Sequence, residues 1–130
     1  MSYTIQVRVD RPFDDVVADV EEALAAEGFG VLCDIDVTGT FEQKLDKEFR
    51  DYRILGACIP PLAAEAIETE LSLGALLPCN VVIYASDDGE VVVEAVDPER
   101  LVGIADNPAL DSVAADVRER FDRVLESVAA

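Results

Sequence analysis

Two adjacent apolar runs in the C-terminal half of the chain restrict its fold more than any other feature. Residues 80–86 read NVVIYAS, residues 90–96 read EVVVEAV, and Asp87, Asp88 and Gly89 join them. Aspartate and glycine tolerate the positive φ values of tight turns, so the two runs are predicted to form an antiparallel hairpin. Several strands of the chain are apolar on both faces, which is typical of a sheet covered on both sides. We therefore expect helices on one side of the sheet and another cover, for which a second subunit is a candidate, on the other.

The other segments alternate between the two-residue period of strands and the 3.6-residue period of helices. Strands are predicted at residues 4–10, 29–37, 52–58, 80–86 and 90–96. Helices are predicted at residues 13–27, 41–49, 60–73 and 110–128. In the second strand the alternation places Val31, Cys33 and Ile35 on one face, and Thr38 or Thr40 is expected to cap the helix that follows. The order strand, helix, strand, helix, strand, helix, strand, strand, helix indicates a mixed α+β fold in one domain over residues 1–130, with a single mixed β-sheet of about five strands covered by helices.

The charge balance is strongly acidic. The chain has 28 acidic and 10 basic residues and a net charge of -18, and only Lys44 and Lys47 are lysine. Such a chain repels phosphate backbones and anionic membrane surfaces, so we expect neither nucleic acid nor a membrane as a partner. An acidic chain with few lysines suggests a salt-loving host. Molar salt shortens the screening length to about 3 Å, so the fold is expected to be more stable there.

The first ten residues, MSYTIQVRVD, alternate between polar and apolar and do not form a basic segment followed by an apolar one. They therefore do not resemble a secretory signal. No apolar run approaches the ~18 to 20 residues of a membrane-spanning helix. These features predict a cytoplasmic protein.

Histidine is absent from the chain, and cysteine occurs three times. The absence of histidine excludes Ser-His and Cys-His dyads, histidine general bases and histidine metal sites within this chain. An odd number of cysteines does not suggest a disulfide framework. Cys33, Cys58 and Cys79 also lack the close spacing of structural zinc ligands, so we expect neither a metal nor a cofactor.

Cys58 and Cys79 each lie beside a strand end and close to a proline. If strands 52–58 and 80–86 run parallel, these two cysteines lie a strand length apart, whereas an antiparallel pairing brings them together. The sequence leaves this choice open. Buried cysteine usually packs as a small inert hydrophobe, whereas a reactive cysteine requires surroundings that stabilise the thiolate.

The two lysines of this chain fall within one helical turn, and Arg53 lies on a neighbouring predicted strand. Lys44 either pairs with Asp36, points into a cleft, or belongs to an ordinary solvated surface where ion pairs are weak. A cleft between Lys44 and Arg53 would suit a small anion.

The phrases YRILGACIPPLA, GALLPCNVVIY, EGFG and DVTGTFEQKL together resemble the domain of unknown function 302 family, over nearly the whole chain. The resemblance implies a compact α/β domain, a homodimer, and no established activity. Backbone-shaping positions implied by the resemblance are Gly56, Pro60, Gly74 and Pro78. Residues with chemical capacity implied by it are Asp36, Lys44, Tyr52, Arg53, Cys58, Cys79 and Asn80. At Ile59 the chain departs from the family pattern, which has asparagine there, and this departure favours packing over polar chemistry.

We therefore predict a cytoplasmic homodimer that binds a small ligand or a partner. Its cleft is expected to be lined by Lys44, Arg53, Cys58, Cys79 and Asn80. The alternative is a thiol-dependent redox or detoxification enzyme, in which Cys58 or Cys79 is the reactive thiol and Lys44 or Arg53 lowers its pKa.

Overall fold

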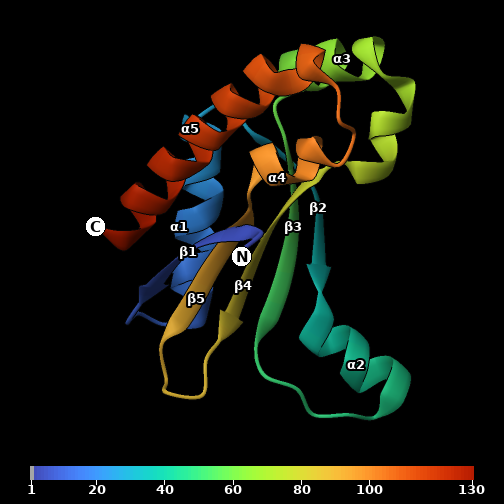
Figure 1. The fold of residues 1–130 in the computed structure, drawn as a ribbon. Helices are drawn as coiled ribbons and strands as arrows, with labels where there is room; N and C mark the ends of the chain where they lie inside the picture. The colour runs from blue at the N-terminus through green and yellow to red at the C-terminus, as the bar shows by residue number, and fades with distance from the viewer. Residues whose placement is uncertain (1) are drawn as a thin grey trace.

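The computed structural model describes residues 2–130, which form a five-stranded sheet with helices (Figure 1). The strands are β1 (Thr4–Val9), β2 (Gly30–Asp36), β3 (Tyr52–Cys58), β4 (Cys79–Ala85) and β5 (Val91–Val96). The helices are α1 (Phe13–Ala26), α2 (Val37–Leu45), α3 (Pro60–Thr69), α4 (Pro98–Gly103) and α5 (Asp111–Ala129). Two short 3-10 helices are η1 (Leu71–Leu76) and η2 (Pro108–Leu110). This architecture confirms the mixed α+β fold with five strands.

The strand order is β1-β5-β4-β3-β2, and every neighbouring pair is antiparallel. The expectation of a mixed sheet is therefore corrected to an antiparallel one. The reason lies in the connection from β3 to β4, which stays at one end of the sheet as α3 and η1 and does not cross back along it (Figure 1). The predicted hairpin of β4 and β5 is confirmed, with Gly89 at φ 89° in its turn.

An irregularity in β2 changes which of its side chains share a face. Val31 pairs with Ala57, and Cys33 pairs with the adjacent Gly56, so the register shifts at Leu32. Such a bulge leaves one extra residue unpaired and reverses the alternation beyond it. The predicted shared face of Val31 and Cys33 is therefore wrong, because consecutive partners on β3 point to opposite faces of the sheet.

Helix α2 begins four residues earlier than its predicted start at residue 41. Asp36 caps it, since its side-chain oxygen accepts a hydrogen bond from the Gly39 amide at 3.0 Å. The two threonines expected as caps have other partners. Thr38 donates to the Arg50 carbonyl at 2.7 Å, and Thr40 donates to the Asp36 carbonyl at 2.8 Å.

One face of the sheet is covered by α1 and α5, which lie together on the same side (Figure 1). Buried side chains from both helices pack on alternate residues of the central strands, among them Leu55, Ile83 and Val93, none of which is exposed. The rings of Phe29 and Phe121 stack with centroids 4.7 Å apart. This layer is the main hydrophobic core.

The opposite face of the sheet carries no helix layer across its central strands, and we call it the open face. Its residues include Ile54 and Val82, which pair with each other across β3 and β4, and Ile35, which is 45% exposed. Helix α2 extends beyond the end of β2 at the lower edge of the molecule (Figure 1).

A second, smaller core closes the other end of the sheet. Helix α3 was expected to continue to residue 73, but it ends at Thr69 and η1 follows it. The small core contains Ala66, Leu73, Val102, Leu110 and Ala114. Its members come from α3, η1, α4, η2 and α5, so these elements form a cap over the end of β3 and the start of β4.

Within residues 2–130, none of the helices has the length and apolar character needed to cross a bilayer.

Candidate functional site

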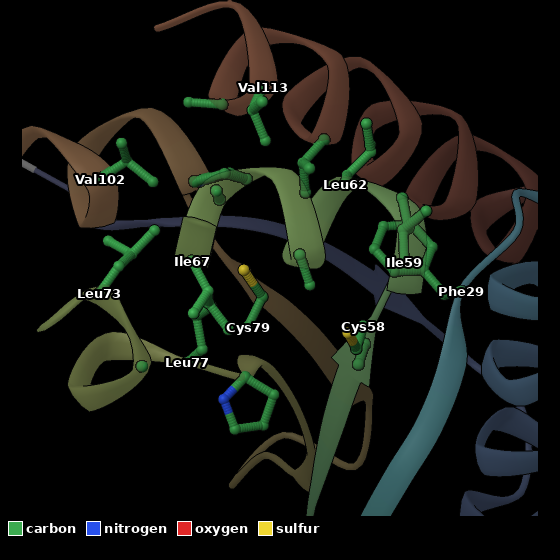
Figure 2. Close-up of a pocket in the computed structure, with 18 of the residues that line it drawn as sticks. Phe29, Cys58, Ile59, Leu62, Ile67, Leu73, Leu77, Cys79, Val102 and Val113 are labelled. Carbon is green, nitrogen blue, oxygen red and sulfur yellow. The ribbon is translucent and has the colours of Figure 1, made fainter. Parts of the chain in front are cut away.

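A cavity of about 290 Å³ lies between the cap and the end of the sheet. Figure 2 shows Cys58 and Cys79 on its sheet side, with Leu62 and Ile67 of α3 and Val113 of α5 around it. The other walls come mainly from η1, α4 and the segment before β2. Of the described residues, none that lines the cavity is charged, and its only side-chain heteroatoms are the two sulfurs. The cavity is thus an apolar space with two thiols in its wall.

The antiparallel pairing of β3 and β4 explains why both cysteines lie at the same end of the sheet and line one cavity. Ala57 pairs directly with Cys79, so Cys58 ends one strand beside the residue that starts the next. Ile59 then turns the chain away from the sheet, and Pro60 begins α3. Ile59 is 8% exposed and lines the cavity, which agrees with its expected role in packing.

Both cavity thiols are free and hold their protons strongly. Burial raises the pKa of Cys79 to about 11, and the nearby Cys58 adds to this shift. Burial also raises the pKa of Cys58. A thiol attacks or binds metal as the thiolate, so these two cysteines are weak nucleophiles near neutral pH. The third cysteine, Cys33, is exposed and lies outside the cavity.

Gly56 of β3 pairs with Cys33 of β2 on one side and with Asn80 of β4 on the other. A side-chain carbon at Gly56 would lie 2.5 Å from the Cys33 sulfur and 2.9 Å from Pro78. These contacts are too close for any larger residue unless the neighbours move. The requirement for glycine here comes from the tight packing of Cys33 and Pro78 over β3.

A row of aromatic rings runs from α2 onto the open face. The Phe41 and Phe49 rings meet edge to face at 5.0 Å, Phe49 lies 6.2 Å from Tyr52, and Tyr52 stacks on Tyr84 at 5.4 Å. Tyr84 donates to Glu94 at 2.6 Å. This bond, with burial and the charge of Glu94, raises the pKa of Tyr84 to about 12. We call Phe41, Phe49, Tyr52 and Tyr84 the aromatic row.

The model of the family described as "Domain of unknown function DUF302" matches residues 5–128. The chain belongs to the DUF302 family. A crystal structure of an uncharacterized conserved DUF302 protein from Bacillus stearothermophilus is similar over 98% of each chain, with 32% sequence identity and a TM-score of 0.90. No curated protein matches the chain.

In this DUF302 domain the six residues expected to form a site occupy separate places. Cys58 and Cys79 line the cavity together. Asn80 pairs with Gly56 across the strands and is exposed on the open face. Asp36 caps α2, and Lys44 is exposed near the end of the same helix. The predicted cleft with Lys44 and Asn80 beside the cysteines therefore does not form within the described chain.

Arg53 is engaged by an aspartate on the neighbouring strand. Its guanidinium donates to both oxygens of Asp34, at 2.8 and 2.6 Å. This two-pronged pair lowers the pKa of Asp34 and raises that of Arg53, chiefly through the side-chain hydrogen bonds. Arg53 thus has a partner within the chain, and it does not line the cavity.

Sequence reasoning did not find most of the cavity wall. Leu62, Ile67 and Leu73 have the spacing of ordinary core residues, and nothing in their pattern distinguishes a wall from a filled interior. The aromatic row was also missed, apart from Tyr52. A signal for it was present, because Tyr52 and Tyr84 become direct partners once β3 and β4 are paired antiparallel.

Proposed function

We propose that this DUF302 domain is a binding module for a small apolar molecule held in the cavity. The observation that carries the proposal is a space of about 290 Å³ whose walls contain no charged residue within the described chain. A dry apolar cavity of about 150 Å³ suffices for benzene. The cavity here has about twice that volume, so a molecule larger than benzene would fit in it.

The protonated state of the cavity thiols supports binding over thiol chemistry. An enzyme that used Cys58 or Cys79 as a nucleophile would need a cation or a helix N-terminus beside the sulfur to lower its pKa. The shifts here run in the opposite direction, because burial dominates at both residues. Lys44 and Arg53, which were expected to activate a thiol, do not line the cavity.

Titration with naphthalene tests this function, because the chain contains no tryptophan to interfere with naphthalene fluorescence. We expect saturable binding to the wild-type protein. Ala66, which is 5% exposed and lines the cavity, is replaced in an Ala66→Phe variant that fills the space. The matched control is Ala64→Phe, on the exposed side of the same helix.

The expected result is a loss of naphthalene affinity of at least tenfold in Ala66→Phe and no change in Ala64→Phe. If Ala66→Phe does not fold, Ile67→Trp serves as the second variant. It adds an indole to the same wall. Fluorescence quenching or energy transfer between that indole and naphthalene then reports binding directly. Absence of saturable naphthalene binding to the wild type would reject the function.

We also propose that the protein is a homodimer in which a second copy covers the open face. The apolar residues and the aromatic row of that face support this proposal, since one face of a sheet this apolar is normally covered. The net charge of -18 on each copy opposes self-association at low salt, so the dimer is expected to form best in high salt. Lys44 on α2, the helix that supplies Phe41 of the row, and Lys47, two residues beyond the end of α2, offer local positive charge to an acidic second copy. Sedimentation of the purified chain is expected to give the mass of a dimer.

A salt-rich cytoplasm is the location we propose. The excess of 28 acidic over 10 basic residues supports the salt-rich part, and three cysteines without a disulfide among the described residues support a reducing compartment. Added KCl is expected to raise the melting temperature up to molar concentration, because it screens the repulsion between carboxylates. A melting temperature that does not change with KCl would contradict this proposal.

A further inference from the structure

We infer that the cavity selects an uncharged ligand of about the size of a two-ring aromatic molecule and rejects carboxylates and other anions. This inference rests on the proposed binding function and specifies its ligand class. It replaces the small anion that the sequence suggested.

The wall offers no partner to a charged group. All of the lining residues in the described chain are apolar or thiols. Transfer of an ionised group from water into such a space without a compensating partner is strongly unfavourable. A charged ligand would have to keep its ionised group outside the cavity, at the surrounding elements.

The elements around the cavity do not supply a cation for such a group either. Helix α3 and η1 contain no lysine or arginine, whereas Glu65 and Glu68 lie on α3 and Glu70 follows it. The charged side chains of α3, the helix that covers the cavity, are therefore all carboxylates.

The arginines of α5 are held by acidic partners. Arg118 binds Asp97 at 2.9 Å and Asp122 at 3.2 Å. Arg120 binds Asp116 at 2.8 Å.

Three further arginines on or beside the wall elements are also engaged. Arg123 of α5 binds Glu27 at 2.8 Å, and Arg53 of β3 binds Asp34. Arg100 of α4 also has an interaction partner. An incoming anion would have to displace an existing partner to reach any of these cations.

The two thiols suit an uncharged aromatic ligand. Sulfur is polarisable and makes favourable contacts with the edges of aromatic rings, and a protonated thiol donates only weak hydrogen bonds. Cys58 and Cys79 both lie on the sheet side of the cavity, so a ring placed there would have sulfur on one side and aliphatic side chains of α3 on the other (Figure 2).

Three naphthalene derivatives that differ mainly in charge test the inference. They are 1-naphthalenemethanol, which is uncharged, 1-naphthoate, which is an anion, and 1-naphthylmethylammonium, which is a cation. We expect the alcohol to bind at least tenfold more tightly than the carboxylate, and also more tightly than the ammonium, in high salt where long-range repulsion is screened.

A lysine placed in the wall should reverse the preference. Val113→Lys introduces a cation from α5, and Ile67→Lys does so from α3 if the first variant does not fold. Either variant is expected to gain affinity for 1-naphthoate by at least tenfold relative to 1-naphthalenemethanol. Ala115→Lys, on α5 but outside the cavity lining, is the matched control and should keep the wild-type preference.

The outcomes separate the two proposals. If naphthalene itself does not bind, the proposed function fails. If naphthalene binds and 1-naphthoate or the ammonium binds as tightly as the alcohol, the binding function stands and the inference of an uncharged ligand is overturned.

Discussion

The cavity beneath α3 and the open face of the sheet are both apolar, yet they differ in shape and in the charges near them. The cavity is a concave space whose described walls contain no charge. The open face is a broad surface on which Tyr84 is bonded to Glu94, and the aromatic row connects it to α2, the helix that carries Lys44. A concave apolar space of this size can enclose a small molecule, whereas a broad apolar face needs a large partner. The same chain therefore offers two kinds of binding surface, one at an end of the sheet and one on its open face.

The largest expected effect is a loss of stability when the core of the covered face is disrupted, compared with the same kind of change in the aromatic row. Phe121 is fully buried and stacks on Phe29, whereas Phe49 is 37% exposed and meets Phe41 edge to face. Phe121→Ala is expected to lower the free energy of unfolding by about 3–5 kcal/mol, because it leaves a cavity in the core. Phe49→Ala should cost about 1 kcal/mol, the typical contribution of an exposed aromatic pair.

Urea denaturation at low protein concentration measures both values. Equal costs would contradict the contrast between a packed and an unpacked face.

The second prediction concerns the contribution of the buried Cys79 thiol to the pH dependence of stability. Cys79 has its pKa raised from 9.0 to about 11 in the folded state. Between these pH values the unfolded chain loses the thiol proton and the folded chain keeps it, so the free energy of unfolding falls as pH rises. The pKa difference corresponds to roughly 2–3 kcal/mol.

In Cys79→Ala, the free energy of unfolding measured by denaturation should fall less steeply from pH 9 to pH 11 than in the wild type. Cys33→Ala, which removes an exposed thiol, is the control and should keep the wild-type slope. A slope in Cys79→Ala equal to that of the wild type would show that this thiol is not the group responsible.

A charge on the open face is expected to weaken self-association. Ile35 is 45% exposed on β2, so Ile35→Lys places an ammonium group on the open face that we propose is covered by the second copy. We expect the dissociation constant of the dimer, measured by sedimentation, to rise at least tenfold. Leu71→Lys is the matched control, since Leu71 is 81% exposed on η1 at the other end of the molecule. Equal weakening by both variants would place the dimer contact elsewhere.

Local patterns in the sequence were sufficient for most of the secondary structure. The alternation of strands and the Asp87-Asp88-Gly89 turn predicted the β4–β5 hairpin, because both signals depend on neighbouring residues. The register shift at Leu32 was not predictable in this way, since a bulge depends on the partner strand. The start of α2 was also missed. Asp36, Thr38 and Thr40 all have side chains suited to capping, and the pattern does not show that Thr38 instead donates to the Arg50 carbonyl and Thr40 to the Asp36 carbonyl.

The candidate site was predictable only in part, because most of it depends on contacts between segments that are distant in sequence. Cys58 and Cys79 were recognised from their positions at strand ends, but their place in one cavity wall depends on the antiparallel pairing of strands 20 residues apart in sequence, which has no local signal. Arg53 was expected to be available to a ligand. Its partner Asp34 lies on the other side of α2 in the sequence and becomes a neighbour only when β2 pairs with β3.

Measurement of the alkylation rate of each cysteine, with and without saturating naphthalene, tests the central claim most directly. The claim is that an apolar molecule occupies the cavity beside Cys58 and the buried Cys79. Cys33, which lies outside the cavity, is the internal control within the same molecule. Naphthalene should slow the modification of Cys58 and Cys79 several-fold and leave that of Cys33 unchanged. Rates at Cys58 and Cys79 that naphthalene does not alter would contradict the account.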